Sequence, residues 1–161
     1  MKKFIAAALA GMAVLCGAAD INLLDGKWSQ YNKTNDKFGT VIRKDGQVDC
    51  FSTVPKGMTG ICKGLIFKKP LTGTVVFGAD VKGEKVVGSV PNNFCVYIDI
   101  TFTDNSKQWG LTCPFKTGTF GWQKMSRTYK FSKPVARMHF YVLFRNMTGK
   151  ASFKNVFLYN K

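Results

Sequence analysis

From residue 21 onward, hydrophobic and polar residues alternate over short stretches, without the sustained spacing of three and four residues that indicates an amphipathic helix. The stretches are rich in β-branched and aromatic residues, and Gly, Pro, Asn and Asp clusters separate them. We expect strands near residues 21–24, 38–43, 47–53, 61–68, 73–82, 94–103, 107–113, 122–131, 135–145 and 151–159. About ten strands in one domain, with no predicted helix, indicate an all-β fold. The expected architecture is an antiparallel β-sandwich or a barrel.

Two of these strands alternate cleanly enough for their faces to be assigned. The predicted core faces carry Phe94, Val96, Ile98, Ile100 and Phe102 on the first strand, and Met138, Phe140, Val142 and Phe144 on the second. The opposite faces carry Cys95, Tyr97, Asp99 and Thr101 on the first strand, and Arg137, His139, Tyr141, Leu143 and Arg145 on the second. If the two strands share a sheet, aromatic, basic and acidic side chains gather on one exposed face.

The first 19 residues have the pattern of a secretory signal peptide. Lys2 and Lys3 precede an apolar run over residues 4–15, which is too short for a membrane-spanning helix, and small residues end at Ala19. We therefore expect one mature domain over residues 20–161, secreted or periplasmic. The alternative is a lipoprotein with Cys16 as the lipidated residue, but Leu15 is larger than the residue that should precede a lipidated cysteine.

Four cysteines remain after residue 19, namely Cys50, Cys62, Cys95 and Cys113. An even count in an exported chain indicates two disulfides, and four cysteines allow three pairings. Cys50–Cys62 and Cys95–Cys113 are favoured because each pair is local in sequence. A zinc site is the first alternative, although no C-x-x-C element is present, and four free thiols are the second.

The Cys95–Cys113 pairing would also set the register of a hairpin. It places Tyr97 opposite Leu111 and Asp99 opposite Trp109, so that Trp109 lies on the exposed face. A slip of one residue would move Trp109 to the other face.

Several segments are familiar in their order and spacing. They are Asn22-Leu23-Leu24, residues 73–84, residues 96–100, Trp109-Gly110, residues 118–123, residues 133–146 and residues 149–158. Together they resemble the CenC-like carbohydrate-binding modules, which have the galactose-binding-like jelly-roll fold, over nearly all of residues 21–159. The resemblance implies a β-sandwich that binds glycans without cleaving them.

The sequence departs from that family at its calcium site. Family members usually have an acidic residue soon after Asn-Leu-Leu and an Asp-Asp pair on the last strand. Here Ser29 follows Trp28, and the last strand carries Lys154 and Asn155. Calcium requires several oxygen ligands and a lysine would repel it, so we expect no metal and no cofactor.

Sugar binding needs a flat aromatic surface for the apolar C–H face of the ring and a few fixed polar groups for its hydroxyls. On the predicted exposed face, the aromatic candidates are Tyr97, Trp109 and Tyr141, the acceptor is Asp99, and the donors are His139 and Arg145. Trp28 and Trp122 are alternative aromatic groups for a site at the loop ends. For each of these residues the competing interpretation is a structural role in packing or surface pairing.

The charge of the chain bears on its partner. The 24 Lys and Arg residues against 9 Asp and Glu give a net charge of +15, which becomes +13 once Lys2 and Lys3 are removed. A charge of this size steers association with acidic polymers, and uronic-acid-rich or sulfated glycans suit both the fold and the compartment. We expect no nucleic-acid binding, because there is no recognition helix or RNA-binding aromatic motif.

Two other functions compete with glycan binding. One is an envelope or extracellular protein-interaction domain that keeps the sandwich and lacks a sugar site. The other is an enzyme, which the sequence disfavours: acidic residues are sparse, and the single histidine, His139, lies in no apparent catalytic triad.

Overall fold

The chain forms ten strands, as seen in a computed structural model that describes residues 22–24 and 26–161. The strands are β1 (Ser29–Gln30), β2 (Phe38–Ile42), β3 (Val48–Ser52), β4 (Met58–Leu71), β5 (Thr74–Gly88), β6 (Phe94–Phe102), β7 (Lys107–Pro114), β8 (Gly118–Lys130), β9 (Val135–Arg145) and β10 (Met147–Asn160). The predicted signal peptide lies outside the described residues. The described residues include no helix that is long and apolar enough to cross a bilayer.

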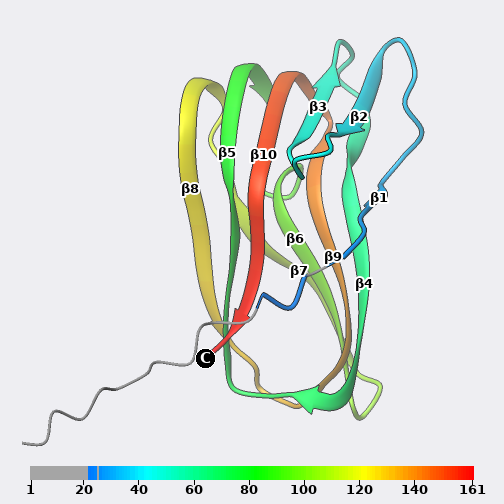
Figure 1. Cartoon of the computed structure of the whole chain (residues 1–161), viewed down its shortest axis with the longest axis vertical. Helices are drawn as coiled ribbons and strands as arrows, with labels where there is room; N and C mark the ends of the chain where they lie inside the picture. The colour runs from blue at the N-terminus through cyan, green and yellow to red at the C-terminus, as the bar shows by residue number, and fades with distance from the viewer. Residues whose placement is uncertain (1–21, 25) are drawn as a thin grey trace, which may run out of the picture.

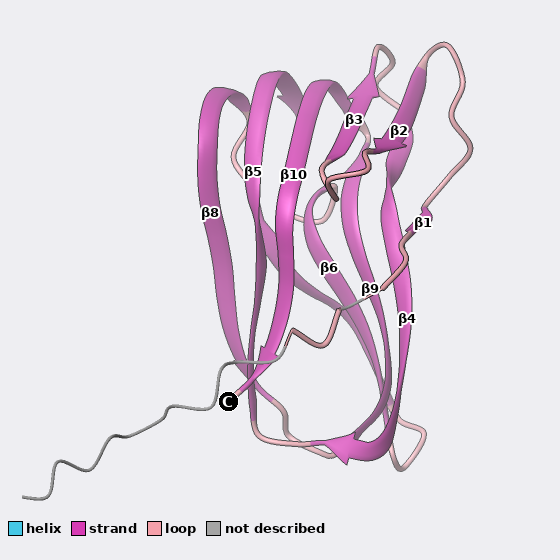
Figure 2. Cartoon of the chain, viewed as in Figure 1, coloured by secondary structure: helices cyan, strands magenta, loops and turns pink. Residues whose placement is uncertain are grey.

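The strands form two five-stranded sheets that pack face to face (Figures 1 and 2). Sheet A has the order β1-β4-β9-β6-β7, and sheet B has the order β2-β3-β10-β5-β8. All the pairings in both sheets are antiparallel. The predicted all-β sandwich is therefore confirmed.

A layer of phenylalanines fills the space between the two sheets. Phe94 of β6 contacts Phe144 of β9 within sheet A and Phe153 of β10 across the sandwich, with ring centroids 5.4 and 6.0 Å apart. All three rings are fully buried. The predicted core faces of β6 and β9 both lie in this core, because a strand with period-two alternation can bury every second side chain against the facing sheet.

The sequence pattern misplaced the first strand. Residues 22–24 form no strand, and β1 lies further along the chain. Asn22 instead ties this segment to β10: its Oδ1 accepts hydrogen bonds from the backbone N–H groups of Leu24 and Leu158, both at 3.1 Å, and its Nδ2 donates to Val156 O at 3.0 Å. The hydrogen bonds of the Asn22 side chain therefore hold this segment against β10, where the sequence predicted a strand.

A bulge in β7 changes the predicted hairpin register. Near its start, Val96 lies opposite Cys113 and Tyr97 lies opposite Thr112, one residue away from the predicted register. The register then shifts, and Ile100 lies opposite Gln108. Two residues, Trp109 and Gly110, thus share the place opposite Asp99. Trp109 therefore lies beside Asp99, as predicted. The bulge is the cause of this placement, because the predicted pairing is not formed near Val96.

The predicted disulfides Cys50–Cys62 and Cys95–Cys113 are wrong, since all four cysteines are free. Cys113 is paired with core-facing Val96, so it points inward, while the neighbouring residue Cys95 points to the other face of sheet A. Cys50 belongs to the core side of sheet B, whereas Cys62 follows core-facing Ile61 and lies on the outer face of sheet A. In each predicted pair, therefore, one cysteine points into the core and the other points away from it, and a disulfide needs the two Cβ atoms to point toward each other.

The bulge predicts a cost for adding a side chain at Gly110. Its φ is +72°, a conformation that disfavours a Cβ atom by about 1–2 kcal/mol. Gly110→Ala should lower the free energy of unfolding by about that amount, measured by urea denaturation. Gly121→Ala is the matched control, because a Cβ at Gly121 meets open space and φ there is not positive. Equal stability of the two variants would contradict the assignment of the bulge.

The free thiols predict a graded reactivity. Burial raises the pKa of Cys50 and of Cys95 to about 12, whereas Cys62 is only partly buried. In the native protein, iodoacetamide should label Cys62 far faster than Cys50 or Cys95, as followed by peptide mass spectrometry. After denaturation without a reductant, all four should be labelled. Protection of a pair under those conditions would show that it is oxidised.

Candidate functional site

The direct pairing of β6 with β9 brings most of the predicted site residues together. Tyr97 lies opposite Tyr141, and Asp99 lies opposite His139. All four belong to the face of sheet A that points away from the core, which we call the outer face of sheet A. The sequence placed each residue on the correct face of its strand, and the structure adds that the two strands are neighbours.

Three tyrosines form the centre of the outer face of sheet A. Tyr141 contacts Tyr97 on one side and Tyr31 on the other, with ring centroids 5.9 and 5.7 Å apart and interplanar angles of 70° and 86°. Tyr31 follows β1, where its backbone N–H donates to Gly60 O at 2.9 Å. Sequence reasoning missed Tyr31, because its position in a loop gave no alternation from which a face could be assigned.

Beside these rings lies a shallow depression of about 100 Å³ that holds both signs of charge. Asp99 lines it and accepts a hydrogen bond from the Gly110 N–H at 3.2 Å, so the bulge fixes one of its oxygens. Arg145 also lines it: the guanidinium lies 5.5 Å from the centre of the Tyr97 ring, and its Nε donates to Asn92 O at 3.1 Å. The depression therefore offers a carboxylate acceptor and a fixed cation next to half-buried rings.

A second depression of about 110 Å³ lies on the other side of Tyr141. His139 lines it and is exposed. Its neighbour across the pairing with β4 is Gly64, which has no side chain to cover the imidazole. His139 is thus open to a ligand that also contacts Tyr141.

Trp109 is the exposed aromatic residue of this region. The residue is 62% exposed, and Lys107 Nζ lies 5.3 Å from the centre of its ring. Trp28 is different, because it packs edge-on against core Phe140 at 5.9 Å. Trp122 is 39% exposed, but it belongs to β8 of sheet B. Of the three tryptophans, therefore, only Trp109 can serve the outer face of sheet A.

Burial and charge act on the two central tyrosines. Burial raises the pKa of Tyr97 and of Tyr141 above the ordinary value, and the negative charge of Asp99 adds to the shift in both. Both effects oppose formation of a phenolate. The two hydroxyls therefore stay protonated through the neutral range and can both donate and accept hydrogen bonds.

The residues at the calcium position implied by the resemblance do not fit a calcium ion. Asn22 Oδ1 already accepts two backbone hydrogen bonds. Asn155 Nδ2 donates to Asp80 Oδ2 at 2.7 Å, and the ammonium group of Lys154 lies 4.3 Å from the centre of the Trp122 ring. Within the described ranges, no group of three or more His, Cys, Asp or Glu side chains could hold a metal ion.

Comparisons with proteins of known structure agree on the fold. The chain is similar to the CBM22-1 xylan-binding domain of Paenibacillus barcinonensis Xyn10C, with a TM-score of 0.55, 11% identity, and coverage of 89% of this chain and 97% of that one. It is also similar to the CBM22-1-GH10 modules of Clostridium thermocellum xylanase Xyn10B, complexed with xylohexaose, with a TM-score of 0.54, 13% identity, and coverage of 83% of this chain and 26% of that one.

A third similar structure is the enzymatically active domain of tailspike protein 4 of bacteriophage CBA120, with a TM-score of 0.51 and 12% identity. The match covers 83% of this chain and 19% of that one. No protein-family model and no curated protein sequence matches the chain. The chain therefore has a jelly-roll β-sandwich fold that carbohydrate-binding modules share. Its resemblance to the CenC-like family in particular stays a prediction.

The contacts of Asp99 predict a change in tyrosine titration. Asp99→Asn should lower the pKa of Tyr97 and of Tyr141, because it removes the carboxylate charge that disfavours each phenolate. The pKa values should stay above the ordinary tyrosine value, since burial is the larger cause. Absorbance at 295 nm against pH measures the change.

The matched control for this titration is Asp104→Asn, which removes an exposed carboxylate that is paired with Lys133. It should leave the tyrosine titration unchanged. An unchanged titration in Asp99→Asn as well would show that the carboxylate does not act on the two rings.

Proposed function

We propose that this protein is a carbohydrate-binding module that holds a glycan on the outer face of sheet A. The observation that carries the proposal is an aromatic surface with fixed polar groups: Trp109 is largely exposed, and Tyr97 and Tyr141 are partly exposed. Asp99 and Arg145 lie against those tyrosines. Aromatic surface combined with oriented polar groups is what a sugar ring needs.

Each group has a distinct part in the proposed complex. The exposed indole of Trp109 stacks against the C–H face of one sugar ring. The tyrosine hydroxyls and Asp99 bind ring hydroxyls, and a charged acceptor makes the stronger hydrogen bonds. Arg145 and His139 donate from the two ends of the tyrosine cluster. Since depressions lie on both sides of Tyr141, the face suits an extended oligosaccharide better than a single sugar.

The proposed activity is binding without hydrolysis. Glycosidases usually act through two carboxylates about 5–10 Å apart. On the described part of the outer face of sheet A, Asp99 is the one carboxylate beside the aromatic residues. A xylan-binding domain and a module complexed with xylohexaose are among the similar structures, and this supports a polysaccharide as the ligand.

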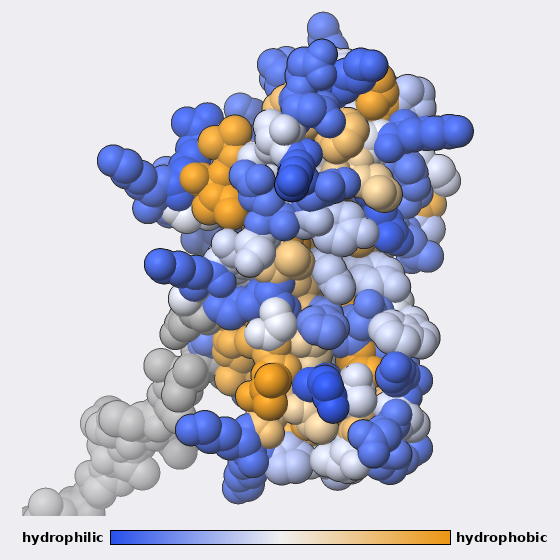
Figure 3. Space-filling model, turned by 90° about the vertical axis from the view of Figure 1, so that its right-hand side faces the viewer, coloured by the Kyte–Doolittle hydropathy of each residue, from blue (hydrophilic) through white to orange (hydrophobic). Residues whose placement is uncertain are grey.

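We further propose that the ligand is an acidic polysaccharide and that the protein is exported. The strands around the site carry Arg137, Arg145 and Lys107, and hydrophilic residues surround the apolar patches on the side of the molecule with β1 and β4 (Figure 3). An excess of cations attracts a polyanion over long distances. The signal-peptide pattern of residues 1–19 supports a secreted or periplasmic location, where such polymers occur.

Replacing Trp109 provides the direct test of the proposal. Calorimetric titration with xylohexaose and with oligogalacturonate of similar length should show binding, tighter for the acidic ligand and weaker as salt is raised. Trp109→Ala should weaken the binding of the neutral ligand, xylohexaose, by about tenfold or more, as expected for an aromatic anchor, and Tyr141→Ala should act in the same direction. Thermal melting checks that each variant is folded.

The matched control for this titration is Trp122→Ala, which removes a partly exposed indole from sheet B. Its affinity should equal that of the unaltered protein. An equal loss in Trp109→Ala and Trp122→Ala, or no binding across neutral and acidic glycans, would count against the proposed site.

A further inference from the structure

A groove of about 420 Å³ lies on sheet B, on the opposite side of the core from the tyrosines. Residues of β2, β3, β5 and β10 line it. The short side chain of Ser152 lies in the middle of the sheet, paired with Asp49 on one side and with Lys82 on the other. Longer side chains surround it, and this difference in length forms the hollow that we call the sheet B groove.

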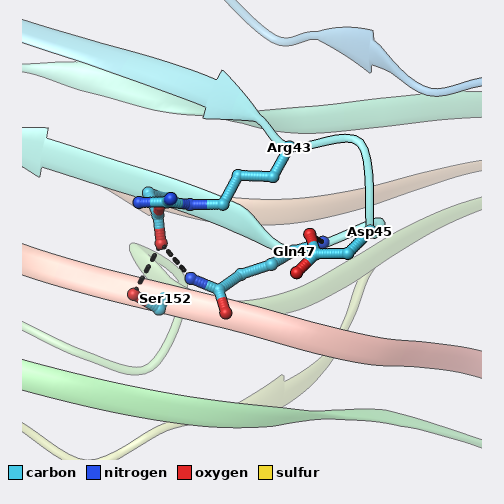
Figure 4. Close-up of polar contacts among 5 residues, drawn as sticks. Arg43, Asp45, Gln47 and Ser152 are labelled. Atoms are coloured by element: carbon cyan, nitrogen blue, oxygen red, sulfur yellow. Dashed lines mark hydrogen bonds and ion pairs between the residues drawn. The ribbon is translucent and has the colours of Figure 1, made fainter.

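The polar side chains of the groove are held in place by Asp49. Figure 4 shows the side chains of Arg43, Gln47 and Ser152 close together. Asp49 accepts hydrogen bonds from Ser152 Oγ at 2.7 Å, from Gln47 Nε2 at 2.8 Å and from Arg43 Nε. Burial acts to raise the pKa of Asp49, but these three donors outweigh it and hold the pKa below its ordinary value. The carboxylate accepts from three side chains, so its main part is to organise its neighbours.

Cationic groups remain available around this network. Arg43 uses only its Nε–H on Asp49, and its two terminal amino groups form no bond with the described part of the chain. Lys82 lines the groove and is exposed. Lys150 has a single long contact, 3.9 Å from Glu84, with its side chain 67% exposed. Three cations and two carboxylates thus line the groove, a net charge of +1: Arg43 is paired with Asp49, Lys150 lies near Glu84, and Lys82 forms no ion pair among the described residues.

Apolar surface completes the groove. Val41 is 50% exposed, and the ring of Phe51 is half-buried; both line the groove. The Gln47 amide keeps its oxygen as an acceptor for a hydroxyl, because its nitrogen donates to Asp49. A guanidinium with both terminal amino groups open is suited to bidentate binding of a carboxylate or a sulfate. The set of groups fits an acidic sugar: apolar contact for the ring, an acceptor for its hydroxyls and cations for its charge.

We propose that the sheet B groove is a second saccharide site, which binds a sugar residue carrying a carboxylate or sulfate group through Arg43, Lys82 and Lys150. The site stands apart from the one on sheet A, because the hydrophobic core separates the two outer faces. With both sites occupied, one molecule bridges two polysaccharide chains or two segments of one chain.

The test follows the Gln47 side-chain amide by nuclear magnetic resonance during titration with oligogalacturonate, with a sulfated oligosaccharide and with a neutral oligosaccharide of equal length. Both acidic ligands should shift this signal in the unaltered protein and in Trp109→Ala, whereas the neutral ligand should not. The double variant Arg43→Gln, Lys82→Gln should weaken the effect about tenfold or more. The more effective of the two acidic ligands identifies the charged group that is recognised.

The matched control is Lys68→Gln, Lys69→Gln, which removes two exposed cations from β4, away from the groove. It should retain the binding at Gln47. An equal loss in both double variants would show that net charge alone attracts the ligand and would overturn the proposal. An unchanged Gln47 signal with both acidic ligands would overturn it as well, and so would saturation by inorganic sulfate at the same concentration.

Discussion

The pairing of β6 with β9 determines both the core and the proposed site. Because side chains alternate along each strand, the register that buries Phe94 against Phe144 also places Tyr97 opposite Tyr141 on the outer face. Any change in the register of β6 against β9 would therefore change the core face and the outer face together. A shift of one residue would expose the phenylalanines and bury the tyrosines, so the large free energy of burying the core also fixes the geometry of the binding face.

The bulge in β7 is the one departure from strict alternation that the site requires. Without it, the offset at Val96–Cys113 would continue along the hairpin and Trp109 would point toward the core. Gly110 absorbs the extra residue with a positive φ, and its N–H reaches Asp99. A single glycine therefore places the indole on the outer face and orients the neighbouring carboxylate.

Alternation in the sequence was enough to predict the faces of β6 and β9, since long runs with period two leave one interpretation. It could not predict Tyr31, whose position depends on how a loop returns to Gly60. The bulge could not be predicted either, because the sequence Trp109-Gly110 is equally compatible with a regular strand. The cysteine pairs failed for a related reason: closeness in sequence does not show which face of a sheet each residue occupies, and Cys95 and Cys113 point to opposite faces.

The attachment of Asn22 to β10 has a consequence for how the domain can be joined to other chains. The backbone N–H of Leu23 donates to Leu158 O at 2.9 Å, so the described beginning and end of the polypeptide lie side by side. Proximal ends of this kind make a fold suitable for circular permutation and for insertion into a surface loop of a host protein. A partner joined directly before Asn22 or after Asn160 would extend from the same part of the sandwich, and neither sheet would have to open to accommodate it.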